Sequence, residues 1–152
     1  MSVIENNSLF RGCSQETLGK VQEAVERKSY AAGTFIFQSG DPADYLYILE
    51  EGRVRLRFGQ GGQVAYALNE PGDVFGWSSM VNQPEYTLSA QSVSTVSVAR
   101  LDKSELGRIL ENDAPSGLVF YRHLGELIGQ RLFNSYKATV FVHGERSSLS
   151  YG

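Results

Sequence analysis

The stretch from Pro71 to Thr87, PGDVFGWSSMVNQPEYT, holds the residues of this chain best suited to binding an anion. A glycine followed closely by two serines, Gly76 with Ser78 and Ser79, can present backbone N–H groups and hydroxyl donors to such a ligand. Trp77 could stack on a purine ring, or it could simply pack beneath the loop. This stretch is therefore the first candidate for a ligand site.

Residues suited to catalysis or metal binding are sparse. The sequence has two histidines, His123 and His143, and one cysteine, Cys13, and no histidine–acid cluster surrounds them. No Ser-His-Asp, Cys-His or paired-carboxylate arrangement stands out. We therefore predict that the protein is not an enzyme and binds no metal, and we favour a surface or interface role for His123 over a haem ligand.

The composition predicts one globular domain. The chain has 152 residues, 41% of them hydrophobic, and a net charge of −3, which argues against binding nucleic acid. A single cysteine indicates a reducing compartment, and the sequence has no signal peptide and no run of 18 apolar residues. We expect a cytoplasmic protein that does not associate with membranes.

The pattern of the chain predicts which elements position the candidate loop. Residues 14–29 are typical of an N-terminal helix capped by Ser14. Between residues 30 and 101, short stretches of period two alternate with glycine-containing turns, which is typical of an antiparallel sandwich or barrel. Residues 102–138 have the caps and stripes of two helices, and residues 139–152 are expected to form a solvated tail.

The glycines fall at the expected corners between strands, and their order resembles a known family. The segments AAGTFIFQSGDPADYLYILEEGRVRL and PGDVFG contain Gly33, Gly40, Gly52, Gly72 and Gly76. Over roughly residues 9–136 the pattern resembles the cyclic nucleotide-binding domain family of catabolite-activator-type regulators, protein kinase A regulatory subunits and gated channels. The resemblance implies a mainly β fold, an eight-stranded jelly-roll barrel (a double-stranded β-helix) with flanking helices and a long C-terminal helix.

The resemblance also implies that the candidate loop is a phosphate-binding cassette. In the family, Phe-Gly-Glu is followed by small and apolar residues and then by Arg with Ala or Ser; the Glu holds the ribose and the Arg pairs with the phosphate. Phe75 and Gly76 match this pattern, but Trp77 stands at the Glu position. Tyr86, or Glu85 if the gap moves by one residue, stands at the Arg position, and Thr87 matches the small residue. The implied ligand-binding residues are Val74, Phe75, Gly76, Trp77, Ser78, Ser79, Glu85, Tyr86 and Thr87.

The two replacements change which ligand is expected. Loss of one partner of a buried charged pair weakens binding by about 2–5 kcal/mol, so cAMP or cGMP should bind only weakly. The backbone cradle that remains could serve another small anionic ligand. We therefore expect a regulatory small-molecule sensor with a degenerate cassette that signals through its C-terminal helix. The alternative is an interaction or dimerisation domain that binds no nucleotide.

The last predicted helix, residues 116–138, is the expected contact with partners. The apolar stripe of this helix is wider than packing on one barrel requires. Some of its residues should therefore contact the barrel and the others a second copy of the chain in a homodimer. The residues assigned to this dimer helix are Leu118, Tyr121, Leu124, Gly125, Ile128 and Leu132. The 16 residues after Tyr136 are too few for a winged helix-turn-helix, so we expect a stand-alone domain without DNA binding, with a separate protein partner as a further candidate.

Overall fold

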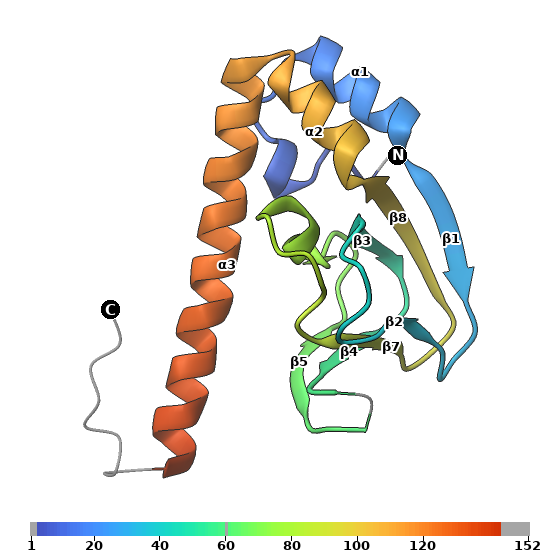
Figure 1. Cartoon of the computed structure of the whole chain (residues 1–152), viewed down its shortest axis with the longest axis vertical. Coiled ribbons are helices and arrows are strands. Elements are labelled where there is room, and N and C mark those ends of the chain that lie inside the picture. Colours follow the sequence, from blue (N-terminus) through green and yellow to red (C-terminus); the bar gives the residue numbers. More distant parts are fainter. Residues whose placement is uncertain (1–2, 60, 144–152) are drawn as a thin grey trace.

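The computed structural model describes residues 3–59 and 61–143, which fold around two four-stranded sheets (Figure 1). One sheet has the strand order β1-β8-β3-β6 and the other β2-β7-β4-β5, and every neighbouring pair is antiparallel. The mainly β jelly-roll fold predicted from the sequence is confirmed. The strands are β1 (Glu26–Tyr30), β2 (Phe35–Phe37), β3 (Tyr45–Glu51), β4 (Val54–Arg57), β5 (Val64–Leu68), β6 (Val74–Phe75), β7 (Ser89–Ser92) and β8 (Val96–Asp102).

Strand β3 separates two hydrophobic cores. Leu46 and Ile48 point to a core shared with the helices, whereas Tyr47 and Leu49 point between the sheets. Since successive side chains of a strand face opposite sides, both faces of β3 are buried, and the apolar run YLYIL follows from this position. The cassette begins in β6, which pairs with β3 and is held against both cores.

The helices gather at one end and along one side of the sandwich (Figure 1). Helices α1 and α2 lie together at the end, and the long α3 runs down the side past the cassette. Asp102 caps α2 by accepting hydrogen bonds from the backbone N–H groups of Ser104 and Glu105, as its sequence predicts. The helices are the 3₁₀ turn η1 (Ser8–Phe10), α1 (Gln15–Ala24), the 3₁₀ turn η2 (Trp77–Met80), α2 (Lys103–Glu111) and α3 (Ala114–His143).

Two helix boundaries differ from the sequence prediction. The predicted helix 14–29 is wrong at its end: α1 stops at Ala24, and residues 26–30 form β1, which pairs with β8. The exposed, polar sequence ERKSY has no alternation to indicate a strand, and pairing with β8 overrides its local preference. Helix α3 extends to His143 instead of residue 138, so the predicted tail 139–152 begins as helix; residues 144–152 lie outside the described part.

A cluster of hydroxyls around one carboxylate fixes the start of α3. The Asp113 carboxylate accepts hydrogen bonds from the hydroxyls of Ser14, Thr17 and Ser116 at 2.7, 2.7 and 2.6 Å. These hydrogen bonds hold the pKa of Asp113 well below its usual range, because they favour the charged carboxylate. The N-cap of α1 and the first turn of α3 are thereby joined at one point.

The two histidines of the sequence do not form a metal site in the part of the chain that the structure describes. His123 places Nδ1 3.4 Å from the carbonyl oxygen of Leu9, where η1 packs on α3. The side chain of His143 is outside the described part. Within the described residues, no group of three His, Cys, Asp or Glu side chains could hold a metal ion, and no helix is both long and apolar enough to cross a membrane.

Candidate ligand site

The cassette turns sharply where β6 ends, and this turn requires glycine. Gly76 has a φ of 74° in the left-handed region, and a Cβ there would lie 3.0 Å from both the Tyr45 carbonyl oxygen and Tyr47 Cδ1. The turn leads into η2, where the Ser79 hydroxyl donates to the Gly76 carbonyl at 2.8 Å. Ser79 is therefore used to close the turn.

Tyr86 occupies the inside of the cassette, and Glu85 does not. The Tyr86 ring stacks on Phe37 with 3.7 Å between centroids, and its side chain is 4% exposed. Its hydroxyl donates to the Tyr45 carbonyl at 2.7 Å and accepts from the Tyr45 N–H at 3.0 Å. Glu85 is exposed, and its backbone bridges to Pro42. Of the two residues predicted for the family's Arg position, Tyr86 therefore places its side chain inside the barrel and Glu85 places its side chain outside; which of them matches that position stays a prediction.

Burial keeps the Tyr86 hydroxyl neutral. Burial raises the pKa of Tyr86 to about 12, although the hydrogen bond with the Tyr45 backbone lowers it in part. A phenol with this pKa carries no charge near neutral pH, and both its donor and its acceptor capacity are already used. Tyr86 therefore offers an anion neither positive charge nor a free donor.

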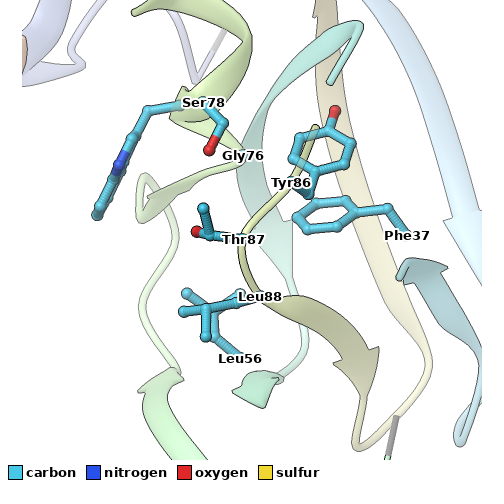
Figure 2. A pocket seen from close by; sticks show the side chains of 8 residues that line it. Phe37, Leu56, Gly76, Ser78, Tyr86, Thr87 and Leu88 are labelled. Carbon is cyan, nitrogen blue, oxygen red and sulfur yellow. The ribbon is translucent and has the colours of Figure 1, made fainter. Parts of the chain in front are cut away.

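A small cavity lies between Tyr86 and the start of η2 (Figure 2). Its volume is about 50 Å³, well below the roughly 300–1,000 Å³ of ordinary ligand pockets. The figure shows Tyr86 stacked on Phe37 at one side, with Leu56, Ser78 and Thr87 at the other. None of the lining residues is charged; they are Phe37, Leu56, Gly76, Trp77, Ser78, Tyr86, Thr87 and Leu88.

Most of the predicted cassette residues divide between this cavity and the surrounding core, whereas Glu85 lines a separate cavity of about 350 Å³ together with Tyr86 and Thr87. Gly76, Trp77, Ser78, Tyr86 and Thr87 come together around the cavity. Val74 and Phe75 are 3% and 0% exposed and belong to the hydrophobic cores. They support the cassette from behind and do not line the cavity.

Trp77 connects the cassette to α3 through an arginine. The Arg131 guanidinium carbon lies 4.5 Å from the centre of a Trp77 ring and 4.8 Å from the Tyr66 ring of β5. Arg131 is 9% exposed, and within the described part of the chain its Nη1 has no hydrogen-bond partner. Burial lowers the pKa of Arg131, while nearby Tyr66 and Asp73 act in the opposite direction.

Neither Arg131 nor Tyr66 was predicted from the sequence as a residue of the site. A signal for Arg131 was present, because it follows Leu124 and Ile128 by seven and three residues and so falls on the barrel-facing stripe of the helix. An arginine within an apolar stripe indicates a buried cation that needs explanation. Tyr66 lies in an ordinary strand and gives no such signal.

The residues assigned to the dimer helix also fall into two groups. Leu124 is 1% exposed and Ile128 packs against the same core, so both face the barrel. Leu118, Tyr121 and Leu132 are exposed, and a Cβ at Gly125 would meet nothing within 4 Å. Phe133, which the sequence analysis omitted, is also exposed and extends the outer face of α3.

Comparison with known sequences identifies the family. The model of the cyclic nucleotide-binding domain family matches residues 27–113. The chain is 32% identical over 104 residues to the cyclic AMP receptor protein of Thermus thermophilus, covering 67% of this chain and 48% of that protein. It is 34% identical over 91 residues to a cAMP-dependent protein kinase regulatory subunit of Pyricularia oryzae, covering 60% and 23%. The chain thus spans less than half the length of these curated relatives.

Solved structures agree with this assignment. A candidate cyclic nucleotide-binding protein from Geobacter metallireducens superposes with a TM-score of 0.75 at 28% identity, over 87% of this chain and 99% of the other. The Thermus thermophilus catabolite activator protein superposes with a TM-score of 0.71 at 25% identity, over 90% and 63%. With its cassette turn, its jelly-roll sheets and a family match over more than half of its length, this chain belongs to the cyclic nucleotide-binding domain family.

Proposed function

We propose that this chain is a non-enzymatic regulatory module in which the state of the cassette is transmitted to α3. The observation that carries the proposal is the contact of Trp77 with Arg131, because Trp77 lines the cavity and also lies against the helix. A ligand that moves Trp77 changes the environment of a buried guanidinium on α3. The helix then shifts its packing, which is a change of population without any chemical step.

Cyclic nucleotides are poor candidates for the natural ligand of this module. No charged residue lines the cavity, its volume is about 50 Å³, and Tyr86, the residue predicted at the family's arginine position, is stacked on Phe37. We expect a cAMP dissociation constant weaker than about 10 μM. Submicromolar binding in a calorimetric titration would contradict this expectation.

Hydrogen exchange of α3 tests the proposed transmission. Trp77→Ala removes the cassette side of the contact, so amides around Arg131 should exchange faster, whereas those around Phe120 and Leu124 should not change, because both side chains lie in the core. Thr87→Ala is the matched control, since it alters the cavity wall without removing an aromatic partner of Arg131. Unchanged exchange around Arg131 in Trp77→Ala would rule out this route of transmission.

A second candidate function is an interaction domain that binds no ligand. Tyr86 favours this second function. Its ring, stacked on Phe37, fills the centre of the cassette, and its hydroxyl already has two hydrogen bonds with the Tyr45 backbone. Titrations with cAMP, cGMP and cyclic dinucleotides separate the two candidates only when α3 exchange is followed as well. An interaction domain shows neither binding nor a response of α3 to changes in the cassette.

In either function we propose that α3 pairs with a second copy of the chain. Leu118, Tyr121, Leu132 and Phe133 are 54%, 43%, 47% and 56% exposed, and Gly125 leaves room for a close approach. Leu132→Glu should convert a dimer into a monomer in sedimentation while the β-sheet circular dichroism stays unchanged. Gln130→Glu, which adds the same charge beside this face, should remain dimeric; wild-type protein that sediments as a monomer at high micromolar concentration excludes the pairing.

A further inference from the structure

Arg131 is a buried cation that forms no ion pair with a carboxylate of the described residues. Its side chain is 9% exposed, and among the described residues Nη1 has no hydrogen-bond partner and no carboxylate forms an ion pair with the guanidinium. Its guanidinium lies against two aromatic rings, Trp77 and Tyr66, and it also hydrogen-bonds with the Tyr66 side chain. Buried charges in proteins are normally paired and hydrogen-bonded, so this environment is incomplete.

The two aromatic contacts do not complete it. A ring face attracts a guanidinium, but it offers no acceptor for the in-plane N–H groups. Asp73 is near enough to influence the pKa of Arg131 without forming an ion pair. The Tyr66 hydrogen bond leaves Nη1 without an acceptor among the described residues, and an anion that matches the planar guanidinium would supply one.

The neighbouring cavity indicates what else such an anion carries. Trp77 belongs to both places, since it lines the cavity and lies under Arg131. The cavity wall is largely apolar, with Phe37, Leu56 and Leu88, and has the hydroxyls of Ser78 and Thr87 (Figure 2). A volume of about 50 Å³ has room for a short apolar chain and none for a nucleoside.

Building on the sensor role above, we propose that this site binds a small carboxylate with a short aliphatic tail. The carboxylate pairs with Arg131 and the tail enters the cavity, while the Trp77 ring turns away from its place between the two. The anion-binding residue of this chain is then on α3, outside the cassette. Tyr86 keeps its structural place throughout, so the filled arginine position of the family does not oppose binding.

Butyrate and its uncharged isostere butyramide test the proposal. Trp77 is the only tryptophan, so its fluorescence reports the ring directly, and calorimetry measures binding independently. Butyrate should give a saturable change in both measurements, and butyramide should give none. Equal responses to the two compounds, or no response to butyrate, would overturn the proposal.

Three variants locate the response. Arg131→Met should weaken butyrate binding by at least about tenfold, and Arg131→Lys, which keeps the charge but not the planar fork, should lie between it and the wild type. Arg55→Met makes the same chemical change on an exposed residue of β4 and should bind as the wild type does. Circular dichroism confirms that each variant is folded, and undiminished binding by folded Arg131→Met would sink the assignment.

Different results would exclude the proposed ligand and the proposed transmission to α3. Butyrate binding without any change in α3 hydrogen exchange would retain this site and exclude the proposed sensor route. Faster α3 exchange in Trp77→Ala, together with no butyrate binding by the wild type, would retain the route and exclude this class of ligand.

Discussion

Trp77 and Tyr86, the residues predicted at the family's Glu and Arg positions, are both aromatic, and their surroundings are opposite. Tyr86 is stacked on Phe37, and its hydroxyl both donates and accepts a hydrogen bond within the barrel. Trp77 lies at the edge of the barrel and contacts a guanidinium whose Nη1 is unpaired among the described residues. The Tyr86 hydroxyl is fully hydrogen-bonded, whereas beside Trp77 the Nη1 of Arg131 has no partner among the described residues.

This difference suggests how a cassette can change its ligand without losing its fold. A residue that joins the core at the Arg position removes the phosphate contact and stabilises the barrel in exchange. A residue such as Trp77, whose polar neighbour has an unpaired hydrogen-bond donor, stabilises the fold less, but it keeps a site that can respond to a ligand. We therefore expect changes at Tyr86 to affect stability most and changes around Trp77 to affect binding most.

The largest expected effect is on the stability of the barrel. Tyr86→Ala should lower the free energy of unfolding by about 3–5 kcal/mol, because it empties a buried aromatic position. Tyr86→Phe keeps the ring and should lower it by about 1–3 kcal/mol, because the Tyr45 N–H and carbonyl lose their shared partner. Urea denaturation of both variants measures the effects, and a loss below 1 kcal/mol for Tyr86→Ala would show that this ring is not part of the core.

The next effect is a gain of cyclic nucleotide binding. The double variant Trp77→Glu/Tyr86→Arg restores the family's two ligand contacts and empties the space beside Phe37. We expect cAMP to bind at least about tenfold more tightly than to the wild type, a modest part of the roughly 2–5 kcal/mol of a buried charged pair. Calorimetry measures the cAMP dissociation constant of the double variant, and each single variant serves as a control. A folded double variant without any gain would mean that the cassette backbone cannot open to a nucleotide.

Alkaline pH gives a smaller effect with a definite sign. Burial raises the pKa of Tyr86 from 10.0 to about 12, so the folded state favours the neutral phenol. The stability contributed by this shift is complete below pH 10 and is lost as the pH rises toward 12, by up to about 1.4 kcal/mol per pH unit. Burial also raises the pKa of Tyr47, so Tyr86→Phe should reduce this loss without abolishing it. Urea midpoints at pH 9, 10 and 11 test this; equal slopes for the two proteins would contradict it.

The sequence predicted the fold well because the fold depends on regular, local signals. Gly76 marks a left-handed turn, Asp102 caps a helix, and the alternation of Val54 and Leu56 with arginines marks an amphipathic strand. The error at residues 26–30 has the same origin. That strand is polar and exposed, and only its pairing with β8 defines it.

The candidate site was less predictable because its central contacts join distant segments. The sequence predicted that Trp77 and either Tyr86 or Glu85 replace the family's ligand contacts, but not that the Tyr86 hydroxyl contacts the Tyr45 backbone 41 residues away. It also gave no reason to place Arg131 beside Trp77, 54 positions earlier in the chain. Such contacts depend on where α3 crosses the barrel, and no local pattern encodes that crossing.

The smallest expected stability effect distinguishes the two ends of the cassette most sharply. Arg131→Met removes two cation–π contacts, which contribute about 0.5–2 kcal/mol each, and the hydrogen bond with Tyr66, and it also removes the desolvation penalty of a buried charge without an ion-pair partner, which is several kcal/mol. The two terms oppose each other, so the unfolding free energy should change by less than about 1 kcal/mol or should increase. Arg55→Met, on an exposed strand position, provides the baseline for the same substitution. A loss above 2 kcal/mol in urea denaturation would mean that Arg131 already has its partner, as Tyr86 does, and that the two ends of the cassette are alike.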